Sequence, residues 1–157
     1  MNKTLQAFTK AVLNADGAHN GSYRFKRTDA AACIRAMLAE QFPGTKFWVR
    51  SQSYAGGCSL DVGYNGSLPG APELKAVETL VKPWGTDGFD GMIDMAYNLE
   101  RWVLPNCTIA GTVTQGTTCS RGVRDAHNDP KPHPEAVLMR GGIGYAFVSN
   151  RRTSSPL

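Results

Sequence analysis

Basic and aromatic side chains alternate in two short segments of the chain. One predicted strand carries Lys46, Trp48 and Arg50 on a single face, because side chains alternate along a strand. An aromatic ring between two cations suits single-stranded nucleic acid, since the ring stacks on a base and the cations neutralise phosphates. Arg24 and Lys26 share a face of another predicted strand. The structural alternative is that a helix covers Trp48 and that the cations only keep a sheet edge exposed to water.

Acidic residues gather in a segment without Lys or Arg, residues 85–100. Apolar residues at helical spacing predict a helix here that ends by Pro105, with Asp90 and Asp94 one turn apart and Asp87 just ahead of them. Two or three carboxylates could hold Mg²⁺ for phosphoryl chemistry. The alternative, which we favour, is that they cap the helix and interact with its dipole. We therefore expect no metal ion and keep the three aspartates as candidates for binding a partner.

The cysteines and histidines form no recognisable catalytic or metal-binding motif. The cysteines are well separated, and no two of them make a CxxC pair. Cys119, His127 and His133 lack the spacing of a compact zinc module, and His127 is expected in a solvated loop. No nucleophile elbow of the GxSxG type is present. We expect free, mostly buried thiols, no catalytic residue and no cofactor.

Several aromatic residues lie near predicted turns or helix ends, where they could anchor a protein partner. They are Tyr54, Trp84, Tyr97 and Trp102. Ordinary core packing is the alternative for each of them.

Hydrophobic periodicity predicts the elements that position these side chains. Apolar stripes at helical spacing predict helices over 3–14, 28–41 with Thr28 as N-cap, 72–82, and the acidic segment described above. Alternation predicts strands at 22–26, 46–51, 59–64, 108–113, 136–140 and 143–149. The second and third strands are expected to form an antiparallel hairpin with one buried face. The last two flank Gly141-Gly142, which is typical of a hairpin turn.

The order of these elements indicates an α+β fold, a small antiparallel sheet with three to four helices packed mainly on one face. The 157 residues fit one domain spanning 1–157. Its expected parts are an N-terminal helix and basic strand at 1–27, a core at 28–104, a long loop at 106–134 and a C-terminal hairpin at 136–150.

Composition narrows the class of protein. Hydrophobic residues make up 41% and charged residues 19%, which is too apolar for a disordered chain. No apolar run reaches the ~20 residues of a membrane helix, and the N-terminus lacks a signal-peptide pattern, so we expect a cytoplasmic protein without membrane contact. The net charge of +4 permits nucleic acid as a partner without requiring it.

Five sequence phrases carry a resemblance to a known family. They are IRAML at 34–38, FPGTKF at 42–47, VRSQSYAGG at 49–57, FDGMID at 89–94 and GYAFVSNRR at 144–152. In this order they resemble the large polyvalent protein-associated domain, type twenty-nine, a module of phage and conjugative-plasmid proteins. The resemblance runs from about Thr28 to Arg152. The family's WTDGP phrase after the second strand is replaced here by YNGSLP at 64–69, so no role of an Asp at that turn carries over.

The resemblance implies a setting rather than a chemical mechanism. Such modules are carried by mobile elements and are thought to help incoming DNA survive host defences. The favoured hypothesis is therefore a non-enzymatic accessory protein that acts in the host bacterial cytoplasm. It would inhibit a host defence protein or ribonucleoprotein, such as a CRISPR or restriction complex, by stoichiometric binding. One alternative is a single-stranded nucleic-acid-binding protein that coats incoming DNA, and another is a metal-dependent nucleic-acid enzyme.

Overall fold

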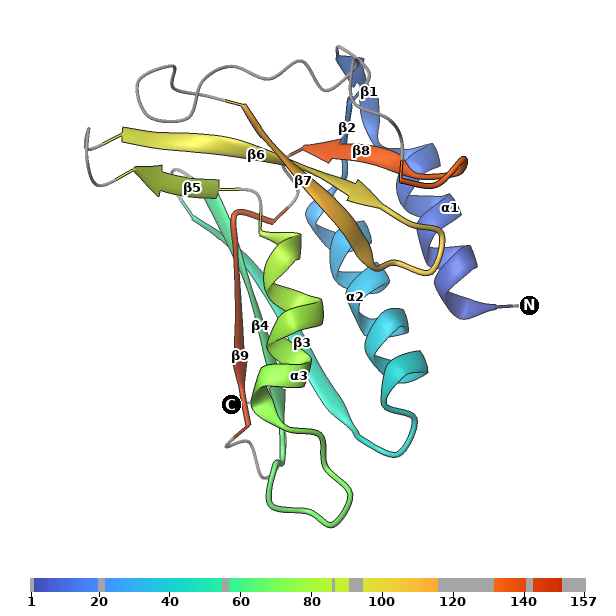
Figure 1. Cartoon of the computed structure of the whole chain (residues 1–157), viewed down its shortest axis with the longest axis vertical. Coiled ribbons are helices and arrows are strands. Elements are labelled where there is room, and N and C mark those ends of the chain that lie inside the picture. The colour runs from blue at the N-terminus through green and yellow to red at the C-terminus, as the bar shows by residue number, and fades with distance from the viewer. Residues whose placement is uncertain are drawn as a thin grey trace.

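The computed structural model of the chain describes residues 2–19, 22–54, 57–85, 87–90, 95–115, 132–140 and 143–150 (Figure 1). Its helices are α1 (Lys3–Asn14), α2 (Arg27–Gln41), α3 (Leu74–Val81) and the 3-10 helix η1 (Lys82–Trp84). The strands before α3 are β1 (Asp16–His19), β2 (Ser22–Arg24), β3 (Phe47–Tyr54) and β4 (Gly57–Tyr64). Those after it are β5 (Asp87–Asp90), β6 (Met95–Val103), β7 (Ile109–Gln115), β8 (Val137–Arg140) and β9 (Tyr145–Ser149).

The strands form two sheets, which confirms the α+β class. The larger sheet has the order β1-β2-β8-β6-β5, and β7 pairs with β6 as well. Within it, β5 and β8 follow one another along one edge of β6 while β7 occupies the other edge. The smaller sheet has the order β3-β4-β9. Each sheet contains one parallel pair, β2 with β8 and β4 with β9, where only antiparallel pairing was expected.

The first helix forms as the sequence predicts. Asn2 caps α1, because its side-chain oxygen accepts a hydrogen bond from the Thr4 backbone N–H at 2.9 Å. The apolar stripe of α1 buries Phe8 and Ala11, and the helix packs against α2. The predicted cap of α2 is wrong: α2 begins at Arg27, and Lys26 occupies the cap position without a side-chain hydrogen bond.

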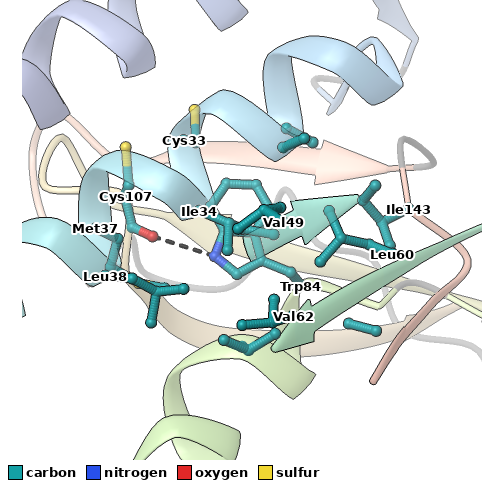
Figure 2. Packing of buried hydrophobic residues seen from close by; sticks show 14 of the residues in the cluster. Cys33, Ile34, Met37, Leu38, Val49, Leu60, Val62, Trp84, Cys107 and Ile143 are labelled. Atoms are coloured by element: carbon teal, nitrogen blue, oxygen red, sulfur yellow. Dashed lines mark hydrogen bonds between the residues drawn. The ribbon is translucent and has the colours of Figure 1, made fainter. Parts of the chain in front are cut away.

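The core lies between α2 and the two sheets and is centred on Trp84, which is fully buried (Figure 2). The Trp84 indole N–H donates to the Cys107 carbonyl oxygen at 3.2 Å. Cys107 has a φ of 68°, the left-handed conformation that few residues other than glycine adopt. Its thiol donates to the Thr4 carbonyl oxygen at 3.3 Å. The turn between β6 and β7 is therefore held against both the core and α1.

Two sequence predictions are wrong in the second half of the chain. The segment expected to be an acidic helix forms β5 and β6, which pair antiparallel. The spacing of its apolar residues fits the repeat of a helix and also that of a strand. Because β6 has strand partners along both edges, the pairing outweighs the helical pattern. The C-terminal hairpin is also absent, because β8 pairs with β6 whereas β9 joins β4 in the other sheet.

The described helices are also short. None of them is long and apolar enough to cross a membrane.

Candidate binding face on the three-stranded sheet

The β3–β4 hairpin forms as predicted and gives the smaller sheet two different faces. Val49, Leu60 and Val62 point to the side on which α2 and α3 pack, and all three are buried in the core. Ala146 on β9 joins them. In Figure 1, α3 runs along this covered side of the sheet. The residues that alternate with these therefore lie on the opposite side.

We call that opposite side the outer face of the smaller sheet. Strand register arranges its residues in three rows, each crossing β3, β4 and β9. From one end of the sheet to the other, the rows are Trp48–Gly63–Ser149, Arg50–Asp61–Phe147 and Gln52–Ser59–Tyr145. Lys46 precedes β3 by one residue and is exposed.

Two aromatic rings stand exposed on the β9 side of the outer face. Tyr145 is 42% exposed and Phe147 is 53% exposed, although large aromatic side chains usually contribute to the core. Their ring centroids lie 6.4 Å apart with an interplanar angle of 21°, so the rings are stacked along the strand. Such exposed apolar side chains, gathered on one strand, mark a binding surface more often than an isolated one does.

Trp48 supplies a third aromatic ring on the β3 side of the outer face. It is partly exposed, and its cross-strand partner on β4 is Gly63, which is buried. A large ring opposite a glycine can lie across the glycine backbone and shield it from water. The predicted shared face of Trp48 and Arg50 agrees with the register, Lys46 lies one residue before β3, and the helices pack on the other face.

The charges on the outer face are mixed. Lys46 and Arg50 are exposed cations beside Trp48, and Asp61 is an exposed carboxylate opposite Arg50. The cations are well placed to contact phosphates of a strand whose bases stack on the rings. The carboxylate lies in the middle of the central row, between Arg50 and Phe147.

Contacts from the core hold this sheet in place. The Arg35 guanidinium on α2 donates from Nη2 to the Val49 carbonyl oxygen at 2.9 Å. The Tyr64 hydroxyl donates to the Pro72 carbonyl oxygen at 2.9 Å, which ties the end of β4 to the segment before α3. The Phe47 and Tyr64 rings pack with centroids 5.3 Å apart on the covered side. Burial, followed by the charges of Glu78 and Glu73, raises the pKa of Tyr64.

The structure separates the other predicted basic residues from this face. Arg24 lies on β2 in the larger sheet, and Lys26 lies immediately before α2. Both side chains are exposed. The two basic segments therefore do not form one continuous sheet surface, and the binding prediction concentrates on Lys46, Trp48 and Arg50.

The acidic candidates lose the helix that was expected to align them. Asp87 and Asp90 lie on β5, opposite Asn98 and Met95 of β6, and Asp94 lies outside the described residues. Among the described residues, no group of three His, Cys, Asp or Glu side chains is arranged to hold a metal ion. Asp87 and Asp90, the two described carboxylates, therefore lie on a strand and not on the helix from which the hypothesis of a metal-dependent enzyme was argued.

Most of the remaining candidates that the structure describes are buried parts of the fold. Cys33 and Cys107 are free and buried, whereas Cys119 and His127 lie outside the described residues. His133 is exposed, and its Nδ1 accepts a hydrogen bond from the Glu135 backbone N–H at 3.0 Å. Trp84 and Trp102, considered above as anchors for a protein partner, are buried. The exposed aromatics that sequence reasoning missed are Tyr145 and Phe147.

A match to a family model identifies the kind of domain to which the outer face belongs. The model for the large polyvalent protein associated domain 29 matches residues 25–155, most of the chain. The chain belongs to this family. Domain 29 is a polyvalent-protein domain associated with phages and plasmids, and the resemblance seen in the sequence phrases is confirmed. Neither a curated protein nor a solved structure matches the chain.

The family match includes every strand of the smaller sheet. The matched range of domain 29 contains β3, β4 and β9, and it excludes α1 and the two strands that follow it. Trp48, Tyr145 and Phe147 thus belong to the domain itself rather than to the N-terminal segment that precedes it.

Proposed function

We propose that this domain 29 protein is a non-enzymatic accessory of a mobile element that binds single-stranded nucleic acid on the outer face of β3, β4 and β9. The observation that carries the proposal is the gathering of Trp48, Tyr145 and Phe147 on a sheet face that the helices leave uncovered. Sheets that present aromatic rings in this way bind unpaired bases by stacking, whatever their sequence.

The spacing of the rings supports binding of more than one base. Tyr145 and Phe147 lie two residues apart on β9, and Trp48 lies across the sheet on β3. Each stacked base is worth roughly 1–3 kcal/mol by alanine substitution. Two such contacts would contribute about 2–6 kcal/mol, and phosphate contacts from Lys46 and Arg50 would add to this.

A second candidate uses the same face for a protein. Exposed aromatic residues beside Arg are typical anchors of protein interfaces, and the stacked pair lies on β9, the last strand of the smaller sheet. The partner would then be a host defence protein or ribonucleoprotein in the bacterial cytoplasm, such as a CRISPR or restriction complex. The protein would counter it by stoichiometric inhibition.

Oligonucleotide binding by the intact protein tests the proposed function. We expect a fluorescently labelled oligothymidine of about 12 nucleotides to bind, as judged by anisotropy. Phe147→Ala and Trp48→Ala should each weaken binding about tenfold, since each removes a stacking ring. Leu13→Ala is the matched control, because Leu13 is 78% exposed on α1 and lies outside the face.

The results separate the two candidates. Equal affinity for wild type and Phe147→Ala, or no binding of any oligonucleotide or oligoribonucleotide, would refute nucleic-acid binding on this face. Capture of a defined defence complex that survives nuclease treatment, and that Phe147→Ala abolishes, would support the second candidate instead.

A further inference from the structure

Asp61 occupies the centre of the outer face, where a surface built only for phosphates would not place a carboxylate. It lies opposite Arg50 on β3 and opposite Phe147 on β9, and it is exposed. A carboxylate repels the phosphate backbone, so its presence costs affinity for nucleic acid unless it meets a hydrogen-bond donor.

The Asp61 carboxylate is available to a ligand. Its side chain is exposed, and the cation directly across the strands from it is Arg50. A cross-strand pair of opposite charges at an exposed position is worth only a few tenths of a kcal/mol to about 1 kcal/mol. A ligand that offers better hydrogen bonds therefore meets little competition from Arg50.

Base edges differ in what they offer to an ionised carboxylate, which only accepts hydrogen bonds. The Watson–Crick edge of guanine presents two adjacent donors, N1–H and the 2-amino group. Adenine and cytosine present one amino group beside an acceptor nitrogen, and thymine and uracil present one N–H between two carbonyl oxygens. An unpaired base that stacks on a sheet aromatic exposes this edge to neighbouring side chains.

We propose that Asp61 makes this face selective for guanine, an inference that rests on the proposed function. The two carboxylate oxygens accept from N1–H and the 2-amino group of a guanine that stacks on Phe147 or Tyr145. The other bases place an acceptor against the carboxylate, so they lose a hydrogen bond and gain a repulsion. The same carboxylate thus lowers affinity for nucleic acid in general and raises it for strands that contain guanine.

Three oligonucleotides of equal length test the inference: alternating thymine–guanine, thymine–adenine and thymine–hypoxanthine. Hypoxanthine keeps N1–H but lacks the 2-amino group. We expect the guanine strand to bind about tenfold more tightly than the adenine strand, the size typical of one two-point base contact, with hypoxanthine in between. Asp61→Asn should abolish the preference while strengthening binding of the adenine strand. Glu135→Gln, at an exposed carboxylate on the segment before β8, should keep the preference.

The outcomes distinguish the two proposals. Equal binding of the guanine and adenine strands by the wild type, or an unchanged preference in Asp61→Asn, overturns guanine selection while leaving nucleic-acid binding in place. Failure of all three strands to bind overturns the proposed function and guanine selection together. Thermal unfolding of Asp61→Asn provides the folding control, since the exposed position predicts an unchanged midpoint.

Discussion

Arg101 of β6 donates two hydrogen bonds to the Gly85 carbonyl oxygen, from Nε at 3.1 Å and from Nη2 at 2.7 Å. Gly85 ends η1, which packs against β9, so this contact links the larger sheet to the strand that carries the exposed aromatics. There is little space around Gly85, because a Cβ atom added there would lie 3.0 Å from the Gly144 carbonyl oxygen.

Gly85→Ala should therefore destabilise the protein. The new methyl group meets backbone on two sides, and backbone cannot move aside cheaply, so we expect a loss of about 1–3 kcal/mol in the free energy of unfolding. Urea denaturation measures it. Gly44→Ala is the matched control, because nothing lies within 4 Å of a Cβ atom there. Equal stability of the two variants would contradict the expected crowding.

Nucleic-acid binding should depend on salt only moderately. With Lys46 and Arg50 as the phosphate contacts, the logarithm of the affinity should fall against the logarithm of salt concentration with a slope of about −1.4. Anisotropy titrations from about 50 to about 200 mM salt measure it. Lys46→Ala should make the slope shallower, whereas Lys3→Ala, an exposed cation on α1, should not. An identical slope in both variants would exclude Lys46 as a phosphate contact.

Trp84→Phe should lower stability through a lost hydrogen bond as well as lost volume. Phenylalanine cannot donate to the Cys107 carbonyl oxygen, which leaves a buried acceptor without that partner, and the smaller ring leaves a cavity. We expect the free energy of unfolding to fall by about 3 kcal/mol in total. Trp48→Phe, at a partly exposed position, should cost under about 1 kcal/mol. Chemical denaturation of both variants measures the two losses in the free energy of unfolding, and equal losses would contradict the expected difference.

The buried Cys33 thiol should make the protein less stable in alkaline solution. A hydrogen bond with Cys107, then burial, then the charges of Cys107 and Asp29 raise the pKa of Cys33 well above its ordinary value of 9.0. Below about pH 9 the thiol is protonated in both states, so its contribution to stability is complete. Above it, the unfolded chain loses the proton first, and stability falls by up to about 1.4 kcal/mol per pH unit.

Denaturation curves from about pH 8 to about pH 10 measure this dependence. Cys33→Ala should flatten the part of the slope that Cys33 contributes. Tyr64 acts in the same direction only above its own ordinary value of 10.0, because its pKa is also raised, so the two groups separate in this range. A slope that Cys33→Ala leaves unchanged would assign the effect to other groups.

Local patterns predicted the parts of the fold whose partners lie nearby in the chain. The stripe of α1 and the alternation of β3 and β4 were sufficient, since a helix and a hairpin bury their faces through contacts close in sequence. They also predicted the shared face of Trp48 and Arg50, which the register supports. The acidic segment forms strands instead of the predicted helix because the spacing of its apolar residues fits both a helix and a strand. Only the pairing of β6 with β5, β7 and β8 decides between the two.

The rest of the site depends on contacts between distant segments. Tyr145 and Phe147 alternate with Ala146 and Val148 in the sequence, which predicted a strand but not its sheet. The apparent Gly141-Gly142 turn favoured pairing with β8, whereas β9 pairs in parallel with β4. Parallel partners are brought together by tertiary packing, not by a local turn, so the meeting of these rings with Trp48 was not visible in one sequence.

The parallel pairing of β9 with β4 also sets when the outer face comes into existence. During synthesis, β3 and β4 can form their hairpin early, but the rings of Tyr145 and Phe147 leave the ribosome only near the end of the described chain. A nascent chain stopped before residue 145 would carry Trp48 without Tyr145 and Phe147. The outer face is thus complete only once β9 has been made and has paired with β4, so ligand capture can report that this pairing has formed.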